Sequence, residues 1–173
     1  MERKMRRFRQ QLDMNECIEI LSSASNGVLS LVDTDGTPYG VPVSFAYDGT
    51  NSIYLHSATQ GHKIDCIHNS DLCSFCVIDR DTIVPEKFTT YFRSVIVRGS
   101  ISIATSRDEI LKGLHLLCEK YSPGIDSAAE IERCLSHVSV LRIDISGMTG
   151  KEAIELKAAQ HENNATDNSQ KES

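Results

Sequence analysis

Apolar and polar residues alternate along most of the chain, and this pattern predicts strands rather than helices. The segment "GVLSLVD" alternates, the turn "TDGT" follows, and "PYGVPVSFAYD" alternates again with Val41, Val43 and Phe45 on one face. Together these segments indicate a β-hairpin. Pro42 has no backbone N–H, so we expect its strand at a sheet edge, at a bulge, or where something other than a strand approaches its backbone.

Further strands are predicted on both sides of the chain's middle. After the turn "DGTN", the segments "SIYLHSA" and "LCSFCVID" read as strands, and "VSVLRIDISG" reads as a final one. The segment "TTYFRSVIVRGSISIAT" is too long for an ordinary strand, and Gly99 is a natural point for a bulge or bend.

Helical spacing is confined to short segments. Asp13 and Glu16 form a capping-box pattern, and Ser106 and Glu109 form a second one. Residues 62–69 and the segment "SAAEIERCL" also read as helices. Five or six strands joined mostly by hairpin-like turns, with few helices, predict a mainly β fold: a small antiparallel barrel with peripheral helices.

The domain organisation follows from length and from the two polar ends. A chain of 173 residues with 40% hydrophobic residues suits one globular domain. We expect a basic N-terminal arm over 1–12, the barrel domain over 13–150, and a polar C-terminal tail over 151–173 that starts as a helix and then becomes disordered. The basic run "RKMRRFR" either lies in solvent or touches a cofactor phosphate or a partner subunit.

Charge and hydropathy exclude some partners. The formal net charge of -6 argues against nucleic acid as a partner, because binding to a phosphate backbone needs a basic face. No apolar run approaches the roughly 18 residues that a membrane span needs. The beginning of the chain also lacks the apolar stretch of a secretory signal. We therefore expect a cytoplasmic protein with no membrane partner.

The cysteines and histidines do not indicate a metal site. The six cysteines are scattered through apolar segments, which is typical of reduced thiols buried as small hydrophobic residues. Cys73 and Cys76 form a CxxC on a predicted strand, where residues three apart face opposite sides and cannot share a metal or a disulfide. His68, His115 and His137 have no suitably spaced carboxylate or cysteine, so we expect no metal ligands.

The segment "IYLHSATQGHKIDCI" combines the end of a strand, a polar turn and the start of a helix. Free N–H groups of the first helical turn and the positive end of the helix dipole would meet there. Ser57 and Thr59 can donate hydroxyls, Gly61 allows a close backbone approach, and Lys63 adds a positive charge, which together suit a phosphate monoester. The alternative is an ordinary strand-turn-helix connection with a solvated lysine.

Three motifs in order carry a resemblance to a known family. They are "GVPVSF", the pair "LHSA" and "GHK", and "RSVIVRG". With them, residues 5–150 resemble the pyridoxamine-phosphate-oxidase-like split barrels that bind FMN, and most closely the 5-nitroimidazole resistance (Nim) branch. The resemblance implies an antiparallel FMN-binding split barrel and a homodimer with FMN sites at the interface. The absence of tryptophan departs from the oxidase proper and puts pyridoxine-phosphate chemistry in doubt.

The resemblance also implies a set of cofactor-binding residues. These are Val41, Pro42, Val43, Ser44, His56, Ser57, Ala58, Gly61, His62, Lys63, Ser94 and Val95. The strand over 41–44 would run along the flavin ring, and residues 56–58 would pass beside the ring and the ribityl chain. Residues 61–63 would take the phosphate. Residues 94–95 would approach the flavin across the dimer interface.

The implied function is that of an FMN-dependent oxidoreductase acting on a small-molecule substrate. It would reduce an acceptor such as a nitroaromatic with electrons from a nicotinamide or another cellular donor. His56 is the candidate catalytic residue because an imidazole can pass a proton at physiological pH; equally, it could only hydrogen-bond the cofactor or a neighbouring strand. The alternative function is a flavin- or haem-binding carrier or sensor without turnover.

Overall fold

The computed structural model describes residues 4–158 of the chain. Its elements follow in this order: η1 Phe8–Gln10, α1 Met14–Ser23, β1 Asn26–Val32, β2 Pro38–Ser44, β3 Ala46–Tyr47, β4 Ser52–Ala58, α2 His62–Asn69, β5 Leu72–Val84, η2 Pro85–Lys87, β6 Thr89–Ile103, α3 Arg107–Tyr121, α4 Ala128–Cys134 and β7 Val138–Glu152. A last helical segment covers residues 154–158. No helix in this described stretch has the length and apolar character needed to cross a membrane.

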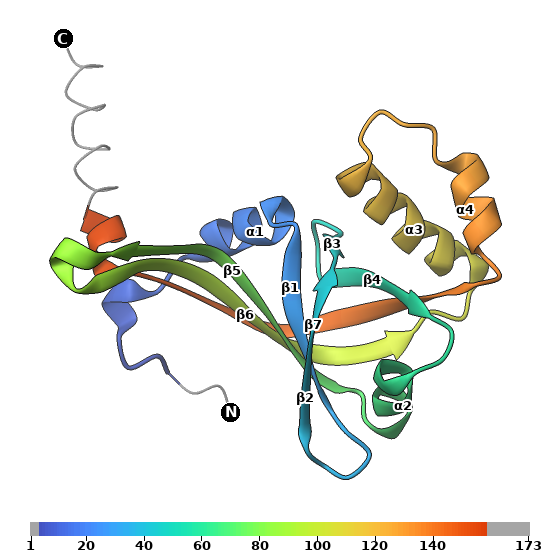
Figure 1. Ribbon diagram of the computed structural model, residues 1–173, viewed down its shortest axis with the longest axis horizontal. Coiled ribbons are helices and arrows are strands. Elements are labelled where there is room, and N and C mark those ends of the chain that lie inside the picture. The colour runs from blue at the N-terminus through green and yellow to red at the C-terminus, as the bar shows by residue number, and fades with distance from the viewer. Residues whose placement is uncertain (1–3, 159–173) are drawn as a thin grey trace.

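The strands form one seven-stranded antiparallel sheet in the order β2-β1-β5-β6-β7-β4-β3. β2 and β3 stand at opposite ends of this order, yet only Phe45 separates them in sequence. Because one residue spans only about 3.5 Å, the two edges must meet, and the sheet is rolled into a barrel (Figure 1). The mainly β fold with peripheral helices that the sequence predicts is confirmed.

Phe45 is held at this junction by contacts from several elements. Its side chain is fully buried, and its ring meets that of Phe75 edge to face with 4.8 Å between the centroids. Its backbone N–H donates to the Tyr121 hydroxyl at 2.8 Å, and that hydroxyl also contacts the carbonyl of Ser25. The ammonium group of Lys120 lies 4.0 Å from the centroid of the Phe45 ring. The end of α3 therefore fastens the point where the two sheet edges meet.

The two predicted capping patterns lie at helix starts. Asp13 accepts the N–H of Glu16 at 2.9 Å, and Glu16 accepts the N–H of Asp13 at 2.8 Å, which completes a capping box on α1. Ser106 accepts the N–H of Glu109 at 3.3 Å. The carboxylate of Glu109 does not turn back to the cap but pairs with Arg142 of β7. This ion pair ties α3 to the sheet.

Two hydrophobic clusters hold the helices to the barrel. The larger one fills the interior and includes buried residues of α1 and α2. The smaller one joins α3 and α4 to β4 and β7, and Figure 1 shows these two helices together at one side of the barrel. Its buried members are Tyr54, Ala104, Leu114, Ile131 and Val140.

Two strand details predicted from single residues are confirmed. β2, which contains Pro42, lies at an edge of the sheet and, within the part of the chain that the structure describes, pairs only with β1. The register between β6 and β7 shifts between Arg98 and Gly99, where a bulge or bend is expected. Cys73 and Cys76 lie on β5, the strand expected for them. Of the six cysteines, which all fall within the described residues, Cys17 and Cys66 are buried as expected and the other four are only partly buried.

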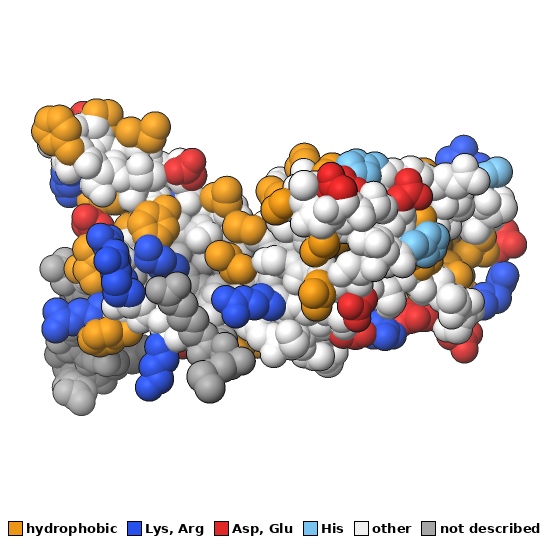
Figure 2. All heavy atoms as spheres, turned by 90° about the horizontal axis from the view of Figure 1, so that it is seen from below, with side chains coloured by type: hydrophobic (Ala, Val, Ile, Leu, Met, Phe, Trp, Pro, Cys, Tyr) orange, Lys and Arg blue, Asp and Glu red, His pale blue; other side chains and the backbone are white. Residues whose placement is uncertain are grey.

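The two ends of the described chain pack beside each other. Leu12 is buried in the barrel core, and its N–H donates to the carbonyl of Gly150 at 3.0 Å. β7 continues to Glu152, two residues past the boundary expected from the sequence. Residues 1–3 of the expected arm and 159–173 of the expected tail lie outside the described residues. Figure 2 shows Lys and Arg side chains gathered at the end of the molecule from which the β5–β6 hairpin projects in Figure 1.

Gly99→Ala is expected to destabilise the protein, because a Cβ there would collide with the backbone oxygen of Asp144 in β7. We expect the free energy of unfolding to fall by about 1–3 kcal/mol, the usual cost of forcing extra atoms into a packed position. The matched control is Gly40→Ala in β2, where a Cβ meets only the Val28 side chain, at 3.7 Å. Urea denaturation measures both variants, and an equal loss in the two would contradict the explanation.

Candidate functional site

The connection between β4 and α2 leaves backbone N–H groups free at the start of a helix. β4 ends at Ala58, and α2 begins at His62 with Gly61 as its N-cap. Gly61 has a φ of 125°, which favours glycine, and within the described residues no side chain caps this helix. The N–H groups of His62 and Lys63 therefore have no partner within the helix. Together with the positive end of the helix dipole, they form a place suited to an anion.

Lys63 adds a positive charge beside these N–H groups. Its side chain is half-buried, and burial lowers the pKa of its ammonium group. In the part of the chain that the structure describes, Lys63 forms no ion pair with a carboxylate. Because a half-buried cation is stabilised by a nearby negative charge, an anion at the start of α2 would offset the cost of burying this lysine.

β2, the strand expected along the flavin ring, presents two different faces. Val41 and Val43 are partly buried against the barrel core, whereas Pro42 and Ser44 are exposed. Among residues 4–158 no strand pairs with the outer edge of β2, so its backbone groups on that side are open to another molecule.

Contacts bring β2, β4 and α2 into one region. β2 approaches β4 where the barrel closes. The rings of Tyr39 on β2 and His62 on α2 lie 4.2 Å apart between centroids. The structure thus places the predicted residues 41–44, 56–58 and 61–63 on neighbouring elements.

The predicted residues of β4 divide between its two faces. His56 is exposed and shares its face with Tyr54, which packs toward α3 and α4. Ser57 is half-buried and shares the opposite face with Leu55, which belongs to the barrel core. Ala58 is exposed at the end of the strand. A ligand that touches the side chain of His56 therefore meets a different surface from one that touches the side chain of Ser57.

Ser94 and Val95 are not brought to the other predicted residues within one chain. They lie on β6, and both β1 and β5 stand between β6 and β2 in the sheet. At ordinary strand spacing that separation is about 14 Å. Val95 is fully buried in the core, whereas Ser94 is half-buried on the outer face.

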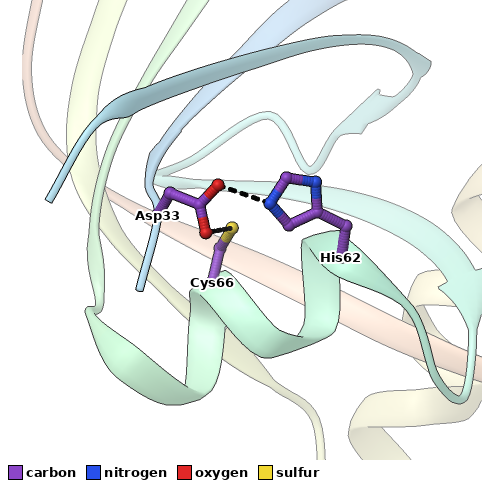
Figure 3. A group of neighbouring side chains, drawn as sticks. All are labelled: Asp33, His62 and Cys66. Atoms are coloured by element: carbon purple, nitrogen blue, oxygen red, sulfur yellow. Dashed lines mark hydrogen bonds and ion pairs between the residues drawn. The ribbon is translucent and has the colours of Figure 1, made fainter. Parts of the chain in front are cut away.

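Sequence reasoning missed the residues that hold the side chain of His62. Nε2 of His62 lies 2.5 Å from a carboxylate oxygen of Asp33, which follows β1 (Figure 3). The thiol of Cys66 lies 3.8 Å from the other oxygen of Asp33. The i, i+4 spacing of His62 and Cys66 on one helix was a readable signal. Asp33 left no such signal, since it is 29 residues from His62.

Arg93 on β6 is engaged by carboxylates rather than open to a ligand. Its guanidinium nitrogens lie 3.5 Å from Glu16, 3.9 Å from Asp79 and 3.7 Å from Glu152. Glu152 is fully buried, and its carboxylate oxygens find no hydrogen-bond donor among residues 4–158. Burial raises the pKa of Glu152, and the charge of Arg93 opposes that shift only in part.

The rolled antiparallel sheet, with α2 beside its closure, is a split barrel. A model of the Pyridoxamine 5'-phosphate oxidase family matches residues 13–152, which is most of the chain. The chain therefore belongs to the pyridoxamine 5'-phosphate oxidase family, and the resemblance seen in the sequence is confirmed. No curated protein sequence matches it.

Several solved structures share the fold. A proposed 5-nitroimidazole antibiotic resistance protein from Bacteroides thetaiotaomicron is 23% identical, with a TM-score of 0.71 over 82% of this chain and 86% of that one. A FAD-binding protein from Mesorhizobium loti is 22% identical, with a TM-score of 0.63 over 83% and 95%. A FAD- and haem-binding protein from Mycobacterium smegmatis is 18% identical, with a TM-score of 0.68 over 83% and 73%. At these identities the likeness establishes the fold.

Glu152→Gln is expected to stabilise the protein increasingly as the pH rises. Because the pKa of Glu152 is raised in the fold, the folded protein favours the protonated side chain. The stability that this proton contributes is fully present below the ordinary glutamate pKa of 4.5 and is lost as the pH rises through the raised pKa. Glutamine has no such proton, so the variant does not lose stability in this pH range. Denaturation across a pH series measures the difference, with the exposed Glu119→Gln as the control. A difference that does not change with pH would contradict the assignment.

Proposed function

We propose that the chain binds FMN, with the phosphate at the start of α2. The backbone N–H groups of His62 and Lys63, the ammonium group of Lys63 and the close approach allowed by Gly61 match what a phosphate monoester needs. The half-buried Lys63, which has no ion-pair partner in the described chain, is the observation that carries this proposal.

The flavin ring is proposed to lie along the outer edge of β2. Backbone groups from Val41 to Ser44 are open on that side, and Pro42 has no N–H that would go unpaired there. The backbone of Ser57 and Ala58, at the end of β4, is proposed to border the ribityl chain, with the flavin on the face of β4 that carries the exposed side chain of His56.

A homodimer is proposed from an apolar strip on the outer face of the sheet. Val28, Cys76 and Ile96 are in register on the neighbouring strands β1, β5 and β6. Val28 and Ile96 are exposed, and so is Ile78 next along β5. Ser94 pairs with Ile78 and shares this face. A second copy docked here would cover the strip and place Ser94 and the backbone beside it at the interface, where they can complete the partner's site, whereas the side chain of Val95 stays in the core.

The activity proposed is that of an FMN-dependent oxidoreductase in the cytoplasm. Bound FMN would supply electron transfer from a nicotinamide or another cellular donor to a small acceptor, while the chain binds and orients the reactants. A nitroaromatic acceptor is supported by the fold shared with the protein named for 5-nitroimidazole resistance. The fold shared with a FAD- and haem-binding protein supports the second candidate, a flavin or haem carrier without turnover.

Lys63→Ala is expected to weaken FMN binding by about 1.5–3 kcal/mol, roughly ten- to a hundredfold, because it removes a hydrogen bond to a charged group. Titration of flavin-free protein with FMN, followed by flavin fluorescence, measures the change. The visible spectrum of the purified protein identifies the resident group, since oxidised flavin and haem absorb differently. The control is Lys87→Ala in the β5–β6 hairpin, which should bind FMN normally. Unchanged affinity in Lys63→Ala would refute the phosphate assignment.

His56→Ala is expected to lower the turnover of a nitroaromatic by on the order of a hundredfold, the smaller end of what proton transfer contributes, while FMN affinity changes little. Steady-state reduction of the acceptor with NADH or NADPH measures turnover. His115→Ala, an exposed histidine of α3, serves as the control. Equal turnover in the wild type and His56→Ala would leave His56 with a hydrogen-bonding role only. If NADH and NADPH do not reduce the bound flavin and no nitro compound reoxidises it, the result would favour the second candidate function, a carrier without turnover.

A further inference from the structure

Three side chains with different metal-binding atoms meet beside the start of α2 (Figure 3). Asp33 lies in the turn after β1, and His62 and Cys66 lie one helical turn apart on α2. One carboxylate oxygen, one imidazole nitrogen and the thiol sulfur all lie within 4.8 Å of one another. The proposed flavin site uses only the backbone of His62, so it does not account for this cluster.

The order of the contacts does not fit a cysteine nucleophile. In such a site the imidazole stands between the thiol and the carboxylate, so that it can take the proton of the thiol. Here Asp33 stands between the other two groups, and the thiol of Cys66 points to its carboxylate. Cys66 is also fully buried, which keeps a substrate from its sulfur.

The charges of the cluster also favour a cation. The carboxylate of Asp33 accepts the N–H of Thr34 at 2.6 Å and contacts the imidazole of His62 at 2.5 Å. The buried sulfur of Cys66 lies 3.8 Å from the same carboxylate. A metal ion would offset both the burial of the sulfur and its repulsion by the carboxylate.

We propose that Asp33, His62 and Cys66 bind Zn²⁺. Carboxylate oxygen, imidazole nitrogen and thiolate sulfur are all zinc ligands, and a mixed set with sulfur favours zinc over Mg²⁺ or Ca²⁺. On binding, the thiol of Cys66 loses its proton to solvent, so the thiolate and the carboxylate together balance the charge of the ion. Three protein ligands leave the fourth position to water.

The distances need only a small adjustment. Oxygen and sulfur atoms bound to one tetrahedral zinc ion lie about 3.5 Å apart, and Oδ1 of Asp33 is 3.8 Å from the sulfur of Cys66. His62 contacts the other carboxylate oxygen, Oδ2, at 2.5 Å, and this contact would open to about 3.3 Å for an ion held by both oxygens of Asp33. His62 is exposed, and its ring stacks on Tyr39, so the imidazole can shift within a supported position.

Zinc analysis of the purified full chain tests the proposal. After equilibration with Zn²⁺ and desalting, we expect about one zinc ion per chain by elemental analysis, with X-ray absorption showing one sulfur among the ligands. His62→Ala and Asp33→Asn should each weaken zinc binding by at least about tenfold, since even outer residues of metal sites have effects of this size. Cys66→Ser should remove the sulfur from the X-ray absorption spectrum.

Matched variants separate this cluster from general zinc binding. His68→Ala and Asp65→Asn change exposed residues of the same helix that lie outside the cluster, and both should keep the zinc. Because His62→Ala replaces an exposed side chain, its loss of zinc is expected without loss of the fold, as measured by circular dichroism. No bound zinc in the wild type, or equal retention in His62→Ala and His68→Ala, would overturn the proposal. Neither measurement depends on whether FMN is bound.

Discussion

The connection through Phe45 is the constraint on which the rest of the structure depends. One residue carries the chain from one edge of the sheet to the other, so β2 cannot drift away from β4. The Tyr121 hydroxyl and the ammonium group of Lys120 hold that residue from the end of α3. If this junction opened, the edge of β2 and the start of α2 would separate, and with them the two halves of the proposed flavin site.

Local patterns in the sequence predicted most of the elements and several details within them, although seven strands are present rather than five or six and β5 continues to Val84. The capping residues Asp13 and Glu16, the proline of the edge strand and the glycine at the bulge each act through their own backbone, so their effects can be read from neighbouring residues. The division of this segment into β2 and β3 at Phe45 could not be predicted. The alternation of apolar and polar residues continues from Val41 to Tyr47, although the chain passes there from one edge of the sheet to the other.

The candidate site was only partly accessible to the same reasoning. The glycine and lysine at the start of α2 are consecutive in sequence, and their grouping follows from the helix alone. The partner of the His62 imidazole is Asp33, which lies in a turn far away in sequence. Arg93 and the three carboxylates around it lie on four different elements. Contacts between residues so distant in sequence depend on the order of the strands in the sheet, and a local sequence pattern does not predict that order. Two separate roles are accordingly proposed for His62, phosphate binding by its backbone N–H and zinc binding by its side chain.

The open edge of β2 has a consequence for the folded chain before any ligand is bound. A strand edge with free backbone groups can recruit another strand, and Pro42 interrupts that pairing only at one position. The flavin proposed to lie along this edge would also shield it from such self-association. If it does, a host cell that is short of flavin would lose more of the newly made chains to aggregation, and the soluble yield would depend on the flavin supply.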